Sequence, residues 1–470
     1  MKLQKYYKRV LKMVEIHFSN YCLKENTYYF LYIGELKNYG LNLFLKDALS
    51  RIKDRKIDFI SIVPDVFEQY NYENLIVINP DAKNFRNKYG HNVSCRISAR
   101  KFLTCVSESQ QIKDLVRKLL DRQDNLYLYL YESMPEMTLD SIPGVFILGP
   151  ESKIAGRLNS KIYQYKNLKG LIPVADFFIC DGMDDLIRTT DRLWPQWKDG
   201  IFVSLEYSAA GSNSIIASSP RDILAKFFGQ EATYLISRNI PHKHDPTVLA
   251  VVANEDAIYI AGVADQRIEN GTRFTGSTFP TKLGNEIVAG LKKQTRTVGK
   301  WLARKGYRGI YGCDFLVDDN GEVIFLEVNA RKQGTTMEFC CTLEQSLPSD
   351  SPMLPELEYY AVIHGKFPEN TIELKKNIKN INWGTYNYKI DKTVFTQGYI
   401  PQNSHEREAF KKVADNNLNK DYVILEHIGN DFVVEEGSFL GRIVALGHDH
   451  SSIQQGLNQG RKIIELTIVK

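Results

Sequence analysis

The chain has 470 residues, of which 43% are hydrophobic, and it carries 60 Lys and Arg against 56 Asp and Glu. This composition is typical of a soluble globular protein and excludes extensive disorder, and the net charge of +4 is too small to indicate a nucleic-acid surface. No run of 18 apolar residues is present, so we expect no membrane partner. Seven cysteines without a C-x-x-C pair, and an N-terminus without a signal-peptide pattern, predict a cytoplasmic protein.

Short apolar segments alternate with helical segments over the first 150 residues. A strand is expected at 27–34, followed by a helix at 41–52 with leucines at helical spacing. Further strands are expected at 57–65, 73–81, 125–132 and 144–150. This alternation predicts a parallel α/β sheet. The loop after the first strand, GELKNYG, is not a G-x-G-x-x-G fingerprint, so a dinucleotide site is not expected.

The character of the sequence changes near residue 151. A turn-rich segment, LPSDSPMLP, lies at 347–355, and the tail holds strand-like runs at 421–447 followed by a helical run. We therefore expect three domains. Their boundaries are 1–150, 151–368 and 369–470, and the last is a small α+β domain.

The segment 306–336 predicts a β-hairpin with polar residues on one face. Asn320 and Gly321 tolerate positive φ and predict a two-residue turn. With that turn, Asp314 lies directly opposite Glu327. Asn329 is two residues further along the second strand, so it shares the same face.

Two carboxylates and an amide on an otherwise apolar hairpin require compensation. Oxygen ligands without His or Cys favour Mg²⁺ or Mn²⁺ over Zn²⁺. Arg331 follows on the same face, and its planar guanidinium suits a phosphate or carboxylate. The alternative is an edge hairpin whose acidic side chains simply point into water.

The sequence GCDFLVDDNGEVIFLEVNAR at 312–331 resembles the signature hairpin of the ATP-grasp superfamily, an acidic residue followed by E-x-N-x-R. The segment 147–178 is similar to the entry of that fold, with a GP turn and a lysine before a helix. The resemblance implies a mixed α/β and α+β architecture. It comprises a Rossmann-like pre-ATP-grasp domain, a two-lobed ATP-grasp core with a lid at about 178–240, and a small C-terminal domain.

The resemblance also implies a nucleotide site. Lys161 matches the first ATP lysine, 202–216 matches the strand–loop–strand that covers the phosphates, and 233–241 matches the adenine hinge. The implied ATP-binding residues are Lys161, Glu206, Ser208, Gly211, Ser212, Ser237, Arg238 and Ile240. The implied metal ligands are Asp314, Glu327 and Asn329.

Two positions depart from the family pattern. Glu206 stands where a second ATP lysine is usual, and Ser237 stands where the hinge usually has a glutamate. The missing lysine leaves the α-phosphate contact to Lys198, Arg221 or backbone amides. The departure also keeps open an atypical ATP site.

The segment 263–280 matches the part of the fold that faces the reacting carboxylate. The implied catalytic residues are Arg331, Arg267 and Arg273. Gln266 and Gly334 are implied substrate-binding residues. Each arginine of the 263–280 segment could equally be a surface charge.

The activity implied is that of an ATP-dependent carboxylate–amine ligase, which forms an amide or peptide bond through an acyl phosphate. ATP and Mg²⁺ or Mn²⁺ are the expected cofactors, and small carboxylates and amines, amino acids or peptides, are the expected substrates. Natural-product or peptide biosynthesis is the expected setting, no nucleic acid is expected as a partner, and the resemblance allows a homodimer. Two alternatives stay open. One is carboxylation as in biotin carboxylase, and the other is a non-catalytic ATP-binding regulator.

Overall fold

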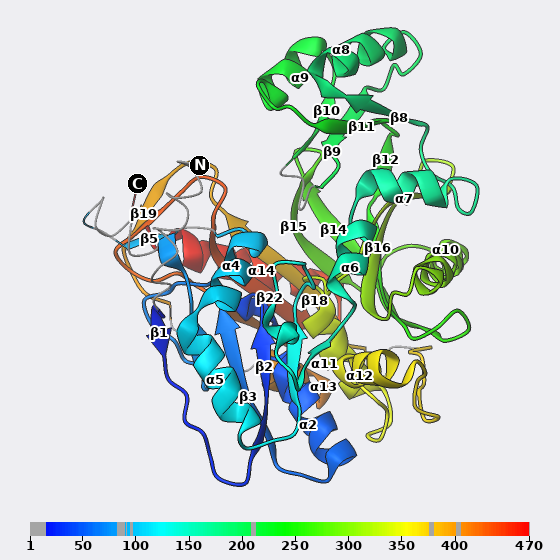
Figure 1. Cartoon of the computed structure of the whole chain (residues 1–470). Coiled ribbons are helices and arrows are strands. Elements are labelled where there is room, and N and C mark those ends of the chain that lie inside the picture. The colour runs from blue at the N-terminus through cyan, green and yellow to red at the C-terminus, as the bar shows by residue number, and fades with distance from the viewer. Residues whose placement is uncertain are drawn as a thin grey trace, which may run out of the picture. The chain divides into compact units, whose positions relative to one another are not determined.

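The computed structural model describes residues 16–81, 90, 92–94, 97–207, 213–375, 380–400 and 406–469. The chain divides into two compact units (Figure 1). Unit 1 comprises Met1–Lys153 and Gly334–Lys470, and unit 2 comprises Ile154–Gln333. Both are mixtures of helices and strands, as the sequence predicted. The division into three domains stays a prediction. None of the helices in the described ranges is both long and apolar enough to cross a membrane.

The first part of unit 1 is an open, mainly parallel sheet with the strand order β1-β4-β3-β2-β6-β7. Its strands are β1 (Phe18–Ser19), β2 (Tyr28–Ile33), β3 (Ile57–Val63), β4 (Leu75–Val77), β6 (Leu126–Leu130) and β7 (Val145–Leu148). Its helices include α2 (Leu41–Lys53), α4 (Ala99–Glu108) and α5 (Gln110–Leu120). The predicted strands and their parallel pairing are confirmed; only β1 pairs antiparallel.

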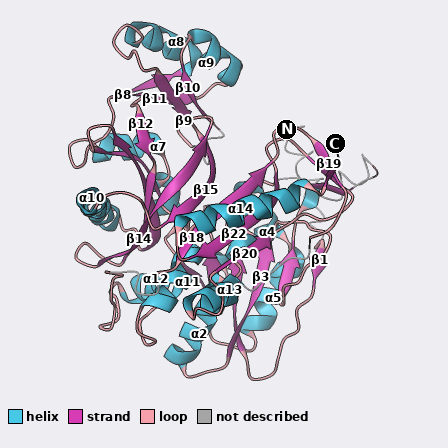
Figure 2. Cartoon of the chain, turned by 180° about the vertical axis from the view of Figure 1, so that it is seen from behind, coloured by secondary structure: helices cyan, strands magenta, loops and turns pink. Residues whose placement is uncertain are grey.

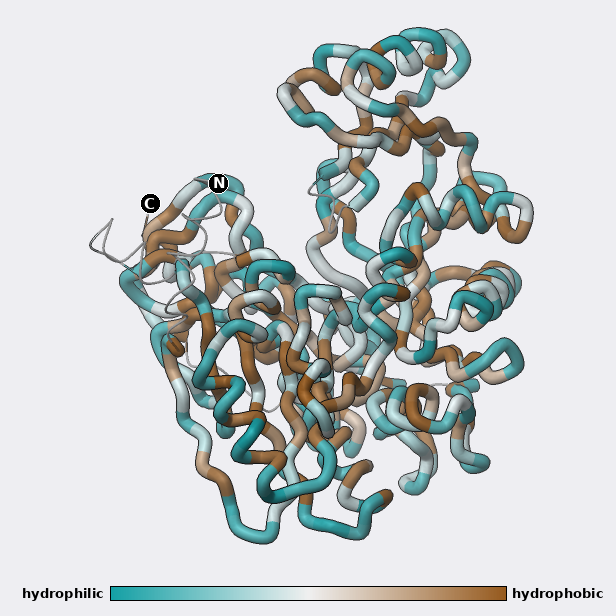
Figure 3. Tube along the Cα trace, in the orientation of Figure 1, coloured by the Kyte–Doolittle hydropathy of each residue, from teal (hydrophilic) through white to brown (hydrophobic). Residues whose placement is uncertain are grey.

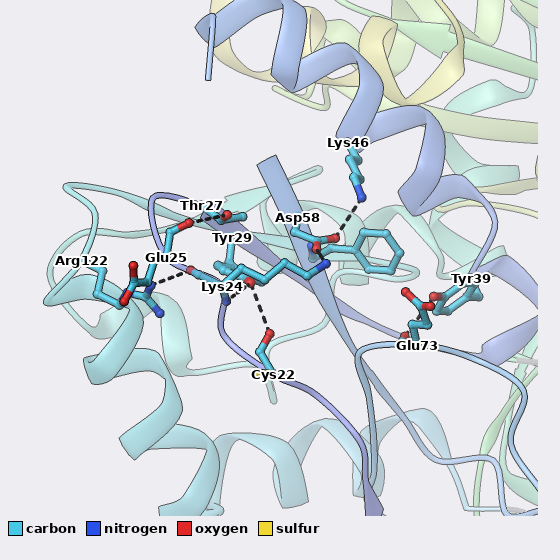
Figure 4. Close-up of polar contacts among 11 residues, drawn as sticks. Cys22, Lys24, Glu25, Thr27, Tyr29, Tyr39, Lys46, Asp58, Glu73 and Arg122 are labelled. Atoms are coloured by element: carbon cyan, nitrogen blue, oxygen red, sulfur yellow. Dashed lines mark hydrogen bonds and ion pairs between the residues drawn. The ribbon is translucent and has the colours of Figure 1, made fainter. Parts of the chain in front are cut away.

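An acidic residue, Asp58, lies in the interior of this sheet. Asp58 on β3 is 4% exposed, yet its carboxylate accepts hydrogen bonds from Lys24 Nζ at 2.9 Å and from Lys46 Nζ at 3.1 Å (Figure 4). The amide of Phe59 donates a third, at 3.1 Å. Burial alone would raise the pKa of Asp58, but the two lysines lower it below its usual value. Unit 1 therefore neutralises this buried acid with two cations.

The second part of unit 1 is an antiparallel sheet with helices. Its strands are β18 (Asn382–Lys389), β22 (Phe439–Gly447) and β20 (Lys420–Leu425), in that order. Its helices are α11 (Thr336–Ser346), α12 (Leu354–His364), α13 (Glu406–Ala414) and α14 (His450–Glu465). Figure 2 shows α14 lying across β18 and β22. Gly460 permits this approach, because a Cβ there would lie 2.7 Å from Ile443 Cγ2.

Four short strands form a further sheet of unit 1, in the order β23-β19-β21-β5. They are β23 (Ile468–Val469), β19 (Val394–Thr396), β21 (Phe432–Val434) and β5 (Asn92–Ser94). The strand-like runs and the final helix of the tail were predicted. The strand β18 and the helix α13 were not, because the Asn- and Lys-rich stretch around them carries no clear periodicity.

Unit 2 is built on an antiparallel sheet with the order β12-β16-β13-β14-β15, and β17 pairs with β16. The strands are β12 (His242–His244), β13 (Pro246–Val252), β14 (Ile258–Glu269), β15 (Arg273–Phe279), β16 (Gly309–Asp318) and β17 (Val323–Asn329). Its helices include α6 (Ser152–Leu158), α7 (Lys161–Leu168) and α10 (Asn285–Arg304). Apolar residues of α10, including Leu291, Val298 and Leu302, are buried in the main core of this unit.

A separate lobe of unit 2 has its own four-stranded antiparallel sheet, with the order β10-β9-β11-β8. It contains β8 (Phe177–Asp181), α8 (Gly182–Leu193), β9 (Ile201–Leu205), β10 (Ser214–Ala217), α9 (Pro220–Phe227) and β11 (Thr233–Arg238). Figure 3 shows hydrophobic residues along these strands and hydrophilic residues along the outer helices. The lobe covers the segment expected to form a lid, and its closing motion stays a prediction.

Candidate active site

The β16–β17 hairpin carries the predicted acidic pair. Asp314 pairs with Glu327, and Gly312 pairs with Asn329, as the sequence predicted. The strand register shifts by one residue nearer the turn, where Phe315 pairs with Phe325. One residue of β17 therefore forms a bulge.

The predicted two-residue turn of this hairpin is wrong. The carboxylate of Asp318 accepts hydrogen bonds from the amides of Asn320 at 2.9 Å and Glu322 at 2.8 Å, while Asp318 N donates to Glu322 O at 3.1 Å. These bonds enclose a three-residue turn, and Gly321 adopts φ +84° in it. The bulge compensates for the extra turn residue, which is why the predicted acidic pair is nevertheless present.

Asp314 is buried, with 9% of its surface exposed. Thr247 Oγ1 donates to its Oδ1 at 2.7 Å, and Asn329 Nδ2 donates to its Oδ2 at 2.9 Å. Burial raises the pKa of Asp314, although Thr247, Lys161, Asn329 and Arg331 all oppose that shift. Burial therefore outweighs the two cations that act on this carboxylate.

Lys161 is the first residue of α7, and its Nζ forms an ion pair with Glu327 Oε2. Ser160 caps this helix, because its hydroxyl accepts a hydrogen bond from Tyr163 N at 3.1 Å. Burial lowers the pKa of Lys161 to about 8; Asp314 opposes that shift and the nearby guanidinium of Arg331 adds to it. The predicted ATP lysine thus lies against the predicted metal carboxylate.

Glu206 occupies the position where the family usually has a second lysine. Its backbone oxygen accepts a hydrogen bond from Lys161 N at 3.0 Å, and its Oε1 accepts one from Ser160 Oγ at 2.5 Å. Glu206 therefore attaches the end of β9 to the start of α7. The predicted substitutes for the lysine, Lys198 and Arg221, are both exposed on the lobe.

Two amide side chains that the sequence analysis missed hold β17 against the same helical segment. Gln164 is 1% exposed; its Nε2 donates to Val328 O at 2.7 Å and its Oε1 accepts from Val328 N at 2.9 Å. Asn159 Oδ1 accepts from Ala330 N at 2.8 Å. These bonds fix the strand that carries Glu327. The sequence signal for Gln164 was a polar residue on the buried side of a helix.

The residues after the hairpin complete the network. Arg331 Nη2 donates to Asn329 Oδ1 at 3.0 Å. Gln333, also missed, lies 3.4 Å from Asp314 Oδ1 through its Nε2. It reaches that position because Gly312 has no side chain, since a Cβ there would lie 2.0 Å from Gln333 Cδ. A glycine within a strand often marks such a close approach.

The predicted hinge residues lie on and after β11. Ser237 is buried at the end of this strand, and Arg238 N donates to Asp176 O at 3.0 Å while its side chain is exposed. Ile240 packs in a small apolar cluster with Leu316. The predicted phosphate-loop residues Ser208, Gly211 and Ser212 lie outside the described residues.

The remaining predicted residues belong to other contacts. Arg267 Nε donates to Thr278 Oγ1 at 3.1 Å along the β14–β15 hairpin. On that hairpin, Gln266 N donates to Asp245 O at 2.8 Å, and Arg273 is the first residue of β15. Gly334 belongs to unit 1, where its oxygen accepts from Arg442 Nη2 at 2.8 Å.

The hairpin has the donor set that a hard divalent cation prefers. Asp314, Glu327 and Asn329 provide two carboxylates and an amide oxygen on one face, and burial raises the pKa of Asp314. Within the described ranges, no group of three His, Cys, Asp or Glu could hold a metal by itself. A cation here would therefore use these three residues together with oxygens from another molecule, such as phosphate.

Comparisons with known proteins agree with this geometry. A family model described as an ATP-grasp domain matches residues 189–335, which include the hairpin and most of the lobe. A curated relative, the [butirosin acyl-carrier protein]–L-glutamate ligase of Niallia circulans, is 21% identical over 257 residues. That alignment covers 52% of this chain and 58% of the relative, so the chain spans little more than half of the relative's length.

Solved structures share the fold over nearly the whole chain. N5-carboxyaminoimidazole synthase from Aspergillus clavatus has a TM-score of 0.55 at 12% identity, covering 94% of this chain and 99% of that one. Biotin carboxylase from Campylobacter jejuni has a TM-score of 0.60 at 13% identity, and the match covers 97% of this chain and 92% of that one. Residues 189–335 therefore match an ATP-grasp domain, and the chain shares the fold of these solved structures.

Proposed function

We propose that this chain is an ATP-dependent ligase that joins a carboxylate to an amine through an acyl phosphate. The observation that carries the proposal is the joined set of Lys161, Asp314, Glu327, Asn329 and Arg331, which brings two cations to two carboxylates on one hairpin. A permanently charged guanidinium beside an acidic pair suits both the binding of phosphate and the stabilisation of charge during its transfer. A site that transfers a phosphoryl group needs it to stabilise the charge on the moving group.

The roles follow from charge and position. Lys161 and Arg331 would bind and orient anionic oxygens of phosphate, and Asn329 holds the Arg331 guanidinium at the hairpin. Asp314, Glu327 and Asn329 would hold Mg²⁺ or Mn²⁺, which supplies neutralisation of the phosphate charge. The protein would contribute positioning and charge and no covalent step. Arg267 and Arg273 are proposed to face the carboxylate substrate together with Gln266 and Gly334.

The named relative supports an amino acid as the carboxylate substrate, since it is a ligase of L-glutamate and the butirosin acyl-carrier protein. Four of the structural neighbours were solved with ADP, one of them with its magnesium salt, which supports ATP and Mg²⁺ as the cofactors. A small amine or amino acid as the acceptor, and a place in natural-product or peptide biosynthesis, complete the proposal.

The test is the release of ADP. The protein is incubated with Mg²⁺-ATP and a pool of amino acids and small carboxylates, with and without amines, and the products are analysed by mass. The proposal expects ADP only when a carboxylate and an amine are both present, and a product lighter by one water than their sum. Glu327→Ala should abolish both signals, whereas Glu322→Ala, on the exposed turn of the same hairpin, should leave them unchanged.

Two outcomes would overturn the proposal. ADP that depends on bicarbonate would assign carboxylation, the chemistry for which the structural neighbours are named. Nucleotide binding that Glu327→Ala does not affect, with no turnover on any pool, would favour a non-catalytic ATP-binding regulator.

A further inference from the structure

A second concentration of charge lies in unit 1, outside the segment that matches the ATP-grasp model. Its members influence one another electrostatically, and we call them the acidic cluster. They are Glu35, Lys37, Asp65, Glu338, Glu406, Glu426 and Arg442. Five carboxylates and two cations leave three negative charges in excess when all are ionised. This imbalance distinguishes the cluster from an ordinary buried salt bridge.

Both cations of the cluster already have partners. The guanidinium of Arg442 forms an ion pair with Glu338 and donates to Gly334 O at 2.8 Å. Lys37 forms an ion pair with Glu35. The other three carboxylates of the cluster therefore have no cation of their own within it.

Three oxygens of the cluster, Glu338 Oε2, Glu406 Oε1 and Glu426 Oε1, are buried without a hydrogen-bond donor among the described residues. Glu338 is 0% exposed and Glu406 is 6% exposed. An unpaired buried carboxylate oxygen costs several kcal/mol unless a proton or a cation compensates it.

The same unit shows what a purely structural buried acid looks like. Asp58 is as well buried as Glu406, but it has Lys24 and Lys46 within 3.1 Å (Figure 4). In the acidic cluster, by contrast, five carboxylates share only Lys37 and Arg442. This shortage of cations in the cluster points to a positively charged group that comes from outside the chain.

The position of the cluster in the sheet is one where ligands bind. Glu35 follows β2 and Asp65 follows β3, at the carboxyl ends of two neighbouring parallel strands. The strand order reverses at β2, since β3 and β4 lie on one side of it and β6 and β7 on the other. Open α/β sheets bind ligands outside the carboxyl ends of their strands at such a switch point. The side chain of Glu35 is 41% exposed, so solvent reaches the cluster here.

Glu426 supplies an independent sign of function. It follows β20 directly and has φ +57°, a left-handed conformation that is uncommon for a glutamate. Such backbone strain concentrates at functional sites. Burial and the neighbouring Asp65 raise the pKa of Glu426 to about 8, although Arg442 and Lys37 oppose the shift. The direction agrees with a shortage of positive charge.

We propose that the acidic cluster binds a small amine that carries two positive charges, such as a diamine or a basic amino acid. A metal ion fits less well, because no group of three His, Cys, Asp or Glu in the described ranges is arranged to hold one. An ammonium group donates three hydrogen bonds without a fixed coordination geometry, so it can serve the unpartnered oxygens of Glu338 and Glu406. The role of this amine as the acceptor substrate rests on the proposed function, whereas its binding does not.

The test is isothermal titration calorimetry with putrescine in the absence of ATP. The proposal expects binding of putrescine, at least tenfold weaker binding of propylamine, and no binding of 1,4-butanediol, which has the same length and no charge. Glu406→Gln and Glu426→Gln keep the side-chain shape and remove one negative charge each, so each should weaken putrescine binding at least tenfold. Glu356→Gln, a buried glutamate of the same unit that pairs with Arg51, is the matched control and should bind as the wild type does.

Folding is controlled by circular dichroism and by a third variant, Glu35→Gln, whose exposed side chain tolerates the change. Absence of putrescine binding to the wild-type chain, or equal binding by the wild type and all three cluster variants, would overturn the inference. Putrescine binding that the variants weaken, with no ADP released on any carboxylate, would uphold the cluster and overturn the ligase proposal. ADP and amide formation with an unchanged KM for the amine in Glu406→Gln would uphold the ligase and overturn the role of the cluster as the acceptor site.

Discussion

Asp314 lies directly opposite Glu327 across the β16–β17 hairpin, and Asn329 Nδ2 bonds to Asp314 Oδ2 at 2.9 Å. This pairing survives an extra turn residue because a bulge in β17 restores the register. The two carboxylates therefore share one face, with Lys161 paired to one of them. The chemistry that we propose depends on this relationship.

The first prediction concerns Glu327. Glu327→Gln keeps the shape of the side chain but removes the charge that Lys161 and a divalent cation would use, so kcat should fall by about 100-fold or more. Steady-state ADP release measures the effect. Glu322→Gln on the turn of the same hairpin should keep wild-type kcat. An equal kcat in both variants would remove Glu327 from the catalytic site.

Gly312 and Gln333 allow a test by double substitution. A Cβ at residue 312 would lie 2.0 Å from Gln333 Cδ, so Gly312→Ala should displace the glutamine from Asp314. Gln333→Ala should therefore lower ADP release by the same factor as Gly312→Ala, and the double variant should be no worse than either one. Additive losses would show that the two residues act on Asp314 separately.

Gln164 joins α7 to β17 through both of its side-chain amide groups. Gln164→Ala leaves the buried N–H and C=O of Val328 without these partners, so the free energy of unfolding should fall by about 2–3 kcal/mol. Urea denaturation followed by fluorescence measures this change. Asn167→Ala removes a partly buried bond within α7 alone and should cost about 1 kcal/mol or less. Equal losses in the two variants would contradict the account.

His427 is expected to make the stability of the folded chain depend on pH. It is 1% exposed; its Nδ1 accepts from Gly429 N at 3.2 Å and its Nε2 lies 3.0 Å from Thr467 Oγ1, so the neutral ring is fully bonded. Burial lowers its pKa to about 4. The unfolded chain then binds the extra proton below its ordinary pKa of about 6.5. The stability due to this neutral ring is complete above pH 6.5 and is lost as the pH falls towards 4.

The size of that loss is about 3 kcal/mol, from about 1.4 kcal/mol for each unit of the shift. Urea denaturation of the wild type and of His427→Gln between pH 4 and 7 isolates it, because the other titrating groups are common to both chains. The stability difference between the two should shrink as the pH falls. A constant difference across this range would mean that His427 is not held neutral by the fold.

Much of the architecture was predictable from the sequence. Strands such as β2 and β3 are short apolar runs bounded by Gly, Pro or Asp, and their parallel pairing follows from the alternation with helices. The acidic pair was predictable because residues two apart on a strand share a face. The three-residue turn was not, since it depends on the carboxylate of Asp318 accepting from two backbone amides.

The residues that support the site could not be predicted from the sequence either. Gln164, Thr247 and Gln333 act through contacts with segments distant in the chain. The spacing of residues within one segment does not predict such contacts. Glu206 was predicted to stand where the family usually has a lysine, and its bond to Ser160 is seen only once β9 and α7 are in place. The acidic cluster likewise gathers residues from both ends of the chain.

The most direct test of the proposed acyl phosphate follows the transfer of oxygen from the carboxylate substrate to phosphate. A carboxylate substrate labelled with ¹⁸O in both oxygens is turned over with Mg²⁺-ATP and an amine, and the inorganic phosphate is examined by mass spectrometry. Activation as an acyl phosphate predicts one ¹⁸O atom in each phosphate released, with ADP as the nucleotide product. Unlabelled phosphate, or AMP and pyrophosphate in place of ADP, would contradict the account.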